Sequence, residues 1–323
     1  MFKKNLSIIF LICLFISCSN KKYFTTIKLA HSLDVSHPVH KAMVFMSERV
    51  KEKSNGKMVV DIYPGGQLGN ERELIELLQI GSLAMTKVST APLESFIPDM
   101  KIFGMPYLFK HDQHRWSVLN GPIGKKLLVS GESYFLKGMC YYDAGSRSFY
   151  TKDQAIKSPS DLKGLKIRVQ KSQTSISMVK SLGGSATPIP WGELYTSLQQ
   201  GVVDGAENNP PSFHLSKHYE VCKFYSLDEH TSIPDVLIMS THIWNNLSNE
   251  EKVWLQVSID ESVVYQRKLW LEATEKALNH IQDAGVEVIY PDKGLFQKAV
   301  NSMYDNYKNE PFYKLIEKIK NHI

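Results

Sequence analysis

Two arginine residues stand in segments whose other residues are typical of buried strands. Arg168 lies inside the apolar run "LKIRV", and Arg147 begins the strand-like segment "RSFYT". A guanidinium among apolar residues is costly unless an anion pairs with it. Arg168 therefore needs either a protein carboxylate, in a buried ion pair, or the carboxylate of a ligand, which the planar fork would bind through two parallel hydrogen bonds.

No motif of a common enzyme class accompanies these arginines. The chain has no G-x-S-x-G elbow, no H-E-x-x-H, no Walker loop and no G-x-G-x-x-G that opens a helix. Asp204 and Glu207 are close together, but three residues apart in a turn they are more often a solvated or capping pair than an acid–base pair. The histidines at 31, 37 and 40 lack the neighbours that a metal site needs. We expect no catalytic residue, no metal and no cofactor.

Length and charge narrow the class of protein further. The 323 residues are 43% apolar and 22% charged, so we expect two lobes or one large α/β domain. The net charge of +5 fits a small anionic ligand and fits a generic basic surface equally well. No long run of Lys and Arg with interleaved aromatic residues is present, so we expect no nucleic-acid partner.

Short β-like runs alternate with helical patterns, which is typical of α/β architecture. In the first half, Asn70 and Glu73 form a capping box for a helix that ends at Gly81. A second series with the same strand–helix order begins near Arg147. The predicted strands cover residues 26–33, 57–64, 82–90, 146–153, 162–169, 186–190 and 202–209, and the predicted helices cover residues 41–51, 70–81, 175–182 and 192–200.

One helix in the C-terminal third is unusually long. Ser248 and Glu251 form a capping box, and no Gly or Pro follows before Gly285. Such a helix is about 50 Å long at 1.5 Å per residue. Because the segment has no sustained heptad, we expect it to brace both lobes and not to form a coiled coil. A strand over residues 285–291 and a closing amphipathic helix complete the chain.

The N-terminus has the pattern of an export signal. Lys3 and Lys4 precede an apolar stretch over residues 8–16, which is too short to span a membrane. The ending "FISC" resembles a bacterial lipobox, in which Cys18 becomes lipidated; ordinary cleavage that leaves Cys18 free is the alternative. This predicts a signal peptide, residues 1–17, and a lipidated cysteine with its tether, residues 18–25. Of the other cysteines, we expect Cys140 and Cys222 to be separate buried thiols, and a disulfide between them is left open.

Five segments together resemble a known family of transport proteins. They are "GGQLGNERELIELLQIGSLAM", "FGMPYLF", "SPSDLKGLKIRV", "TPIPWGELYTSLQQGVVDGAENNP" and "HYEVCKFYSLDEH". In this order they resemble the DctP family, the extracytoplasmic solute-binding subunits of tripartite ATP-independent periplasmic (TRAP) transporters, from Thr26 to Ile323. The resemblance implies a two-lobed α/β periplasmic-binding-protein fold with a ligand cleft between the lobes and a long helix shared by both. It also implies a periplasmic location, membrane permease subunits as partners and no enzymatic activity.

With the resemblance, the lobes are expected to be residues 26–145 with 234–273, and residues 146–233 with 274–323. The family's ligand groups match this sequence one residue at a time. Arg168 matches the arginine that clamps the substrate carboxylate, and Arg147 matches a second arginine of the same cleft. Asn208 matches an asparagine that bonds to the carboxylate or to a neighbouring hydroxyl group.

Further matches lie on both halves of the chain. Trp191 occupies the position of an aromatic residue that packs on the ligand, although core packing would also explain it. Glu71 matches a carboxylate that reaches substrate hydroxyl groups, although a carboxylate in the first turn of a helix also favours the helix dipole. Ser89, His31 and Ser32 fall at positions of the first lobe that face the cleft.

The polar groups expected around the clamp fit a polyhydroxylated acid. Glu71, Ser89, His31 and Asn209 can bond hydroxyl groups, and an indole face suits the apolar side of a sugar ring. The segments "TKVS" and "GAENNPPSF" resemble the hexuronate-binding branch, so we expect glucuronate, galacturonate or a related sugar acid. C4-dicarboxylates are the alternative ligands, with Arg147 as the second clamp. A periplasmic sugar-acid enzyme such as a lyase is the alternative of another class.

Overall fold

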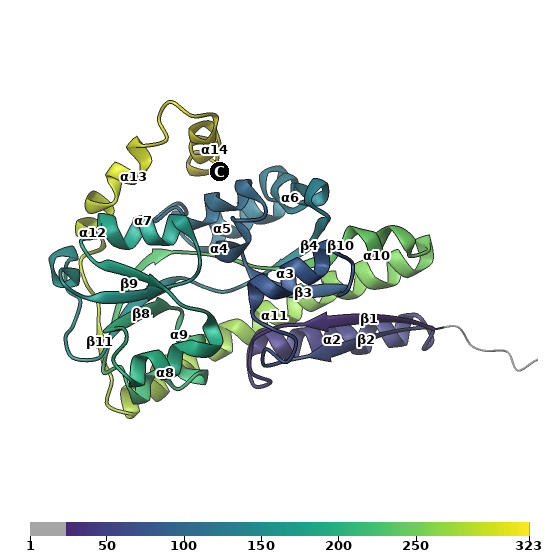
Figure 1. The fold of residues 1–323 in the computed structure, drawn as a ribbon, viewed down its shortest axis with the longest axis horizontal. Helices are drawn as coiled ribbons and strands as arrows, with labels where there is room; N and C mark the ends of the chain where they lie inside the picture. The colour runs from purple at the N-terminus through teal and green to yellow at the C-terminus, as the bar shows by residue number, and fades with distance from the viewer. Residues whose placement is uncertain (1–23, 323) are drawn as a thin grey trace, which may run out of the picture.

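The computed structural model describes residues 24–322, which form a mixed α/β protein with two β-sheets (Figure 1). The predicted signal peptide, residues 1–17, and Cys18 lie outside the described residues. Within residues 24–322, no helix is long and apolar enough to cross a membrane.

The first sheet has five strands in the order β2-β1-β3-β10-β4. Strands β1, β2 and β3 are parallel to one another, while β10 is antiparallel to both of its neighbours. The strands are β1 (Thr25–Ala30), β2 (Met58–Tyr63), β3 (Met85–Ser89), β4 (Leu136–Tyr142) and β10 (Asp235–Ser240). The helices that accompany these strands are α2 (Pro38–Lys53), α3 (Glu71–Gln79), α4 (Thr90–Leu93), η2 (Pro98–Gly104), α5 (Asp112–Asn120), α6 (Pro122–Val129), η3 (Glu132–Tyr134) and α10 (Thr241–Asn246).

The second sheet has six strands in the order β11-β9-β5-β8-β6-β7. The strands are β5 (Arg147–Thr151), β6 (Lys166–Val169), β7 (Ser185–Pro188), β8 (Gly205–Asn208), β9 (Phe224–Thr231) and β11 (Glu287–Ile289). Its helices are η4 (Pro159–Leu162), α7 (Gln173–Ser181), η5 (Trp191–Glu193), α8 (Leu194–Gln199), α9 (Pro210–Leu215), η6 (His218–Glu220), α12 (Lys293–Ala299) and α13 (Asn301–Asp305). The last helix, α14 (Pro311–Lys320), lies beside α5 of the first lobe (Figure 1). Both sheets mix parallel and antiparallel pairs.

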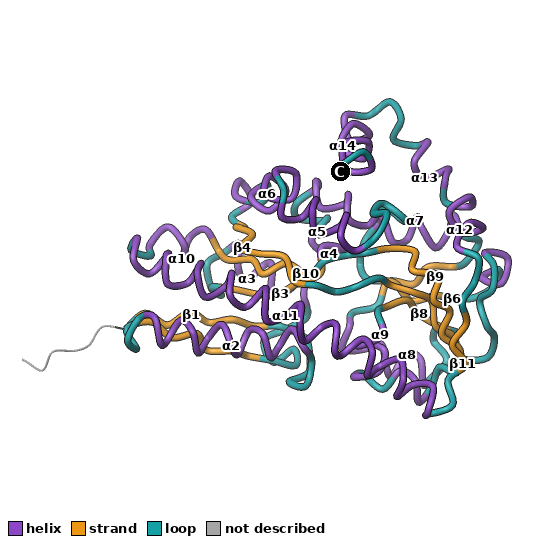
Figure 2. Tube along the Cα trace, turned by 180° about the vertical axis from the view of Figure 1, so that it is seen from behind, coloured by secondary structure: helices purple, strands orange, loops and turns teal. Residues whose placement is uncertain are grey.

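The chain passes between the two sheets at three places. Residues 143–146 join β4 to β5, residues 232–234 join β9 to β10, and α11 (Asn249–Asp283) runs along both lobes (Figure 2). Helix α11 packs against α2 beside the first sheet and against α9 beside the second. The long helix that the sequence predicts is therefore present and braces both lobes.

Helix α11 is held at its start and near its middle. The predicted capping box is formed, because Ser248 Oγ accepts from the backbone of Glu251 and the Glu251 carboxylate accepts from the backbone of Ser248. Further along, the buried Gln266 accepts a hydrogen bond from Asp143 N and donates one to Asp143 O, both of 2.8 Å. The helix is thereby fastened to the first crossover between the lobes.

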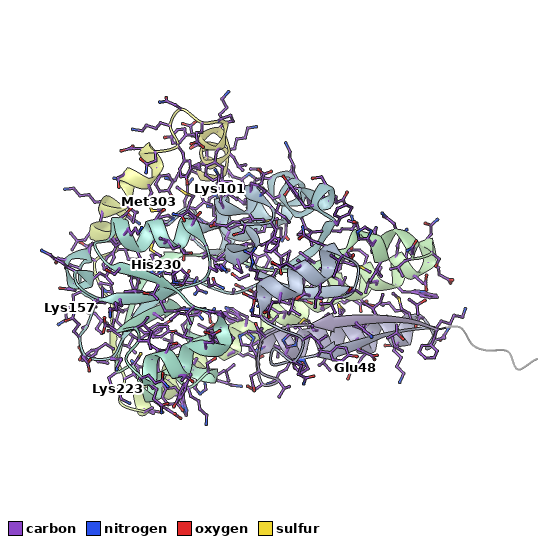
Figure 3. All side chains as sticks on the ribbon, viewed as in Figure 1. Glu48, Lys101, Lys157, Lys223, His230 and Met303 are labelled. Atoms are coloured by element: carbon purple, nitrogen blue, oxygen red, sulfur yellow. The ribbon has the colours of Figure 1, made fainter. Side chains whose placement is uncertain are left out.

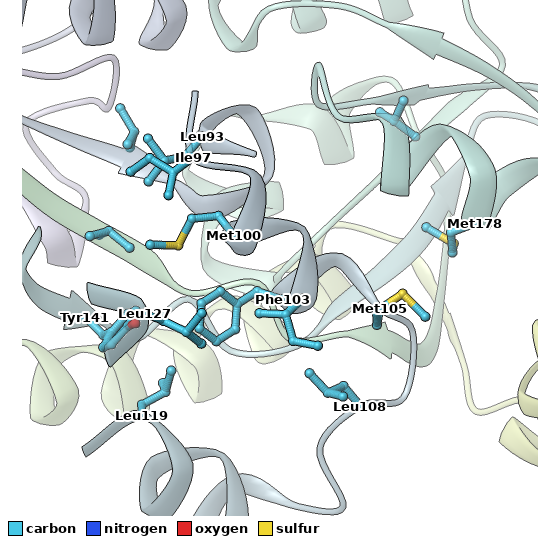
Figure 4. Packing of buried hydrophobic residues seen from close by; sticks show 14 of the residues in the cluster. Leu93, Ile97, Met100, Phe103, Met105, Leu108, Leu119, Leu127, Tyr141 and Met178 are labelled. Atoms are coloured by element: carbon cyan, nitrogen blue, oxygen red, sulfur yellow. The ribbon is translucent and has the colours of Figure 1, made fainter. Parts of the chain in front are cut away.

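The largest apolar cluster connects the two lobes beside the crossovers. Phe103 and Met105 of the first lobe and Met178 of the second belong to the same buried cluster (Figure 4). A second cluster lies between the first sheet, α2 and α11, and a third lies between the second sheet and α8, α9 and α11. This packing gives both walls of the space between the sheets a rigid support.

The predicted strands and helices are present, with shifts of up to four residues at their ends, but β4, β9, β10, α5 and α6 are not among them. The closing amphipathic helix predicted at the C-terminus is present as α14, and two further helices, α12 and α13, precede it. Pro311 starts α14 at a position where its missing N–H costs nothing, and it cannot continue a preceding helix. Helix α14 packs near α5, where His114 Nε2 lies 2.9 Å from Ile319 O. The residue at which one lobe ends and the other begins stays a prediction.

Candidate functional site

A cavity of about 300 Å³ opens between the two lobes. Ser32 and Glu71 line it from the first lobe, and Arg168 and Trp191 line it from the second. A smaller, deeper cavity adjoins it and shares Ser32, Glu71, Gln170 and Trp191. The deeper cavity is also lined by Arg147, Asn208, Asn209, Ser89, His37, Lys87 and Asp235. The volume of the outer cavity lies at the lower end of the range for small-molecule sites.

Arg168 lacks an anionic partner among the described residues. Its side chain is 1% exposed, and Nε donates a hydrogen bond of 2.8 Å to the backbone oxygen of Ile189. Atom Nη1 is buried and bonds no group within residues 24–322. Burial lowers the pKa of Arg168, because desolvation disfavours the charged form. The ion pair with a protein carboxylate, which the sequence left open, is not found in the part of the chain described.

Arg147, in contrast, has its charge compensated by the protein. Both Nε and Nη2 bond the carboxylate of Glu207, and Nη2 also donates to the Glu207 backbone oxygen at 2.7 Å. Atom Nη1 donates to Asn208 Oδ1 at 2.8 Å. The paired carboxylate raises the pKa of Arg147 against the opposing effect of burial. Arg147 therefore orients the amide of Asn208 in the deeper cavity.

The buried His230, on strand β9 of the second sheet, lies next to this ion pair. Figure 3 labels His230 within the second lobe. Its Nδ1 lies 2.8 Å from Asp228 Oδ2, and its Nε2 lies 3.6 Å from Glu207 Oε2. Burial by itself lowers the pKa of His230, but the two carboxylates raise it to about 9. Burial by itself raises the pKa of Glu207, but Arg147 and His230 lower it to about 2. The network therefore alternates positive and negative charges and fixes the side chains that it contains.

Asn208 ends strand β8 at the deeper cavity. Its Oδ1 accepts hydrogen bonds from Arg147 and from the backbone N–H of Asn209. No bond to its amide nitrogen is found within residues 24–322, so this donor is available to a ligand. Asn209 is the N-cap of α9, where its Oδ1 accepts from Ser212 N at 2.9 Å.

Glu71 and Ser89 lie together on the first lobe. Glu71 is the first residue of α3, which the predicted capping box of Asn70 and Glu73 starts, and its Oε1 accepts from Ser89 N at 3.0 Å. Burial raises the pKa of Glu71, an effect that Lys87 opposes. Ser89 Oγ donates to Gln170 Oε1 at 3.2 Å and so connects the two lobes. Both predicted residues line the deeper cavity.

Of the two predicted site residues that follow β1, one lines the cleft and the other does not. Ser32 lines both cavities, as expected from its place after β1. His31 is not brought together with the other predicted residues, because it lines neither cavity. Its Nδ1 accepts from Leu33 N at 3.1 Å, and its Nε2 lies 3.0 Å from His40 Nδ1. These two contacts hold the buried ring of His31.

Trp191 follows strand β7 and is half-buried at the cleft. Its ring lies 5.9 Å from the Arg168 guanidinium and 5.3 Å from the ring of His218. Burial lowers the pKa of His218 to about 3, so that ring is neutral beside Arg168. The indole thus lies beside Arg168 and His218 and borders both cavities.

The deeper cavity is also lined by Lys87, Asp235 and His37, which the sequence did not indicate as site residues. Lys87 interrupts the apolar run "AMTKVS", a signal of the same kind as the one that pointed to Arg168. Within residues 24–322, no group of three or more His, Cys, Asp or Glu is arranged to hold a metal ion. Cys140 and Cys222 are both buried and free, which confirms the expectation of two separate thiols.

Comparison with known proteins places the chain in a family. Residues 29–310 match bacterial extracellular solute-binding protein family 7, the DctP family, and the chain belongs to it. The curated protein YiiZ of Salmonella typhimurium is 40% identical over 299 residues, which are 92% of this chain and 91% of that protein.

Two solved structures are similar over nearly their whole length. A TRAP periplasmic solute-binding protein of a Bradyrhizobium species, in complex with α/β-D-galacturonate, is 39% identical with a TM-score of 0.89, over 92% of this chain and 99% of that one. Another from Anaerococcus prevotii, with bound α/β-D-glucuronate, is 38% identical with a TM-score of 0.87, over 91% and 98%. The predicted two-lobed fold and the predicted family are therefore confirmed, and the family is extracellular and solute-binding.

Proposed function

We propose that the protein binds a hexuronate, such as galacturonate or glucuronate, in the periplasm and delivers it to the membrane subunits of a TRAP transporter. The observation that carries this proposal is the buried guanidinium of Arg168, whose Nη1 is unpartnered within residues 24–322 at the wall of the cleft. A buried cation without an anion is costly, so the site is built to receive one. The two similar structures with bound uronates support the same ligand class.

The groups around Arg168 fit the rest of a sugar acid. Glu71, Ser89 and Asn208 offer acceptors and a donor to hydroxyl groups. Trp191 offers an apolar face beside the clamp. Closure of the lobes on the ligand would exclude water and strengthen the bonds to Arg168.

C4-dicarboxylates, the second candidate ligands, fit these contacts less well. A second ligand carboxylate needs a second free cation, and Arg147 is already paired with Glu207. Glu71 at the shared wall of the two cavities would repel a second carboxylate. The charges of the cleft therefore favour a ligand with one carboxylate and several hydroxyl groups.

Two further parts of the proposal concern export and chemistry. Cys18, in the lipobox-like "FISC", would carry the lipid that holds the protein at the membrane, with residues 18–25 as the tether. The protein would release its ligand chemically unchanged, since solute binding is the activity of the family to which the chain belongs.

A thermal-shift panel tests the proposed ligand class. At a concentration 100 times the Kd, a ligand stabilises the folded state by about 2.7 kcal/mol, which raises the Tm of a chain of this length by about 4 °C. We expect this shift with galacturonate or glucuronate and a clearly smaller one with succinate and malate. Equal shifts for both classes would contradict the proposal. New products after incubation with uronates would instead identify a sugar-acid enzyme.

A further inference from the structure

The deeper cavity contains a group of three charged side chains that the carboxylate clamp does not explain. Lys87 on β3 is 3% exposed, and its Nζ lies 3.0 Å from Asp235 Oδ2 on β10 and 3.5 Å from Glu71 Oε1 on α3. Strands β3 and β10 are antiparallel neighbours, which brings Lys87 and Asp235 to the same place on the sheet. All three side chains line the cavity.

Each carboxylate uses only one of its oxygens for Lys87. Within residues 24–322, Asp235 Oδ1 and Glu71 Oε2 bond no other group, and an ammonium with two partners keeps a third N–H. The cavity therefore presents an acceptor, a donor and a second acceptor side by side. Two carboxylates with one ammonium also leave a net negative charge, which disfavours an anionic group at this place.

Hydroxyl groups match this arrangement better than an anionic group, which would face its net negative charge. Each hydroxyl can donate its proton to a carboxylate oxygen while its own oxygen accepts from an ammonium. Two neighbouring hydroxyl groups would thus satisfy both free carboxylate oxygens and share Lys87. The deeper cavity has about 40 Å³, which is room for a few water-sized groups. Because Glu71 and Trp191 border both cavities, hydroxyl groups of a ring held by its carboxylate at Arg168 can reach into it.

We propose that Lys87 and Asp235, together with Glu71, form a diol-binding subsite that recognises the hydroxyl groups of the ligand. This inference rests on the proposed function, because it assumes that Arg168 holds the carboxylate of a sugar acid. A purely structural role is the competing explanation, in which the Lys87–Asp235 pair only holds β3 against β10. The two explanations differ in whether the effect of a substitution depends on the hydroxyl groups of the ligand.

Calorimetry on the full mature chain with two ligands separates these explanations. Galacturonate carries a ring, a carboxylate and hydroxyl groups, whereas cyclohexanecarboxylate carries the ring and the carboxylate alone. A site that hydrogen-bonds hydroxyl groups rejects a ligand without them, so we expect the wild type to prefer galacturonate by about 10³-fold or more. Asp235→Asn and Lys87→Met should each weaken the affinity for galacturonate at least about 30-fold. The affinity for cyclohexanecarboxylate, measured by displacement, should change less than about threefold in both variants.

A matched control is available in another buried ion pair. Asp143 is buried and lies 2.8 Å from Arg115, and it lines neither cavity of the cleft. Asp143→Asn should leave the ratio of the two affinities unchanged. If Lys87→Met does not fold, the isosteric Asp235→Asn makes the same comparison.

The outcomes distinguish the subsite from the proposed function. A wild type that does not bind galacturonate contradicts the proposed function itself. A wild type that binds galacturonate, with Asp235→Asn weakening both ligands equally or neither, overturns the diol-binding subsite alone. Equal affinity of the wild type for the two ligands also overturns it.

Discussion

Replacement of Arg168 tests the carboxylate clamp through two opposite effects. In the ligand complex, the guanidinium would form two charge-assisted hydrogen bonds, each contributing about 1.5–3 kcal/mol. Their loss in Arg168→Met therefore costs about 3–6 kcal/mol, which is about a 10²–10⁴-fold weaker affinity. In the free protein, the same substitution removes a buried cation that has no anionic partner among the described residues. We therefore expect the Tm of ligand-free Arg168→Met to equal or exceed that of the wild type.

Arg168→Lys separates the shape of the group from its charge. An ammonium keeps the positive charge but cannot present two parallel N–H groups to a carboxylate. We expect its affinity for galacturonate to fall by at least about tenfold. Arg49→Ala is the control, because Arg49 pairs with Glu261 away from both cavities and should bind as the wild type does.

Isothermal calorimetry on these variants, with Tm measured on the same samples, provides the assay. Near-native affinity of either Arg168 variant would refute the clamp. A Tm that collapses in Arg168→Met, while the remaining folded protein binds normally, would show that Arg168 supports the fold and not the ligand.

Three further predictions concern other parts of the chain. Trp191→Ala should weaken uronate binding about tenfold with little change in Tm, and uronates should change the tryptophan fluorescence of the wild type more than that of the variant; an unchanged affinity would assign Trp191 to packing. The pKa of His230 is raised from 6.5 to about 9 by Asp228 and Glu207 against the effect of burial, so its stabilisation is complete below pH 6.5 and is lost as the pH rises through 9. Scanning calorimetry should show Tm falling over that interval in the wild type but less in His230→Gln, and parallel curves would contradict the assignment. Mass spectrometry of the mature protein should find a diacylglyceryl group on Cys18, and an unmodified N-terminus elsewhere would exclude the anchor.

Local signals in the sequence predict most strands of the two sheets, but they do not predict β4, β9 and β10 or how the strands pair. The capping box at Ser248 and the absence of Gly and Pro defined the 35-residue helix α11 correctly. Strand β10 was not predicted, because its place between β3 and β4 depends on residues about 100 or more positions away. The crossovers between the lobes depend on the same long-range pairing.

In the candidate site, too, the sequence identifies single side chains but does not show which groups lie next to them in the folded protein. The apolar neighbours of Arg168 signalled a buried cation, but whether a protein carboxylate reaches it depends on the folded chain. Lys87 is likewise a cation beside apolar strand residues, but the sequence does not show that it faces the cleft. Its partner Asp235 lies on β10, a strand that the sequence did not predict. His31 and Ser32 are adjacent, yet only Ser32 lines the cavities, whereas His31 bonds the backbone of Leu33 and lies against His40.

Calorimetric titration of the wild-type protein with galacturonate and succinate tests the central claim most directly. Arg168 offers one free cation, while Glu71 and Asp235 face the place that a second carboxylate would occupy. We expect galacturonate or glucuronate to bind with a Kd of about 1 μM or tighter, about −8 kcal/mol. Succinate and malate should bind at least about a hundredfold more weakly. Succinate or malate binding as tightly as the uronates would contradict the sugar-acid assignment and favour a dicarboxylate-binding protein.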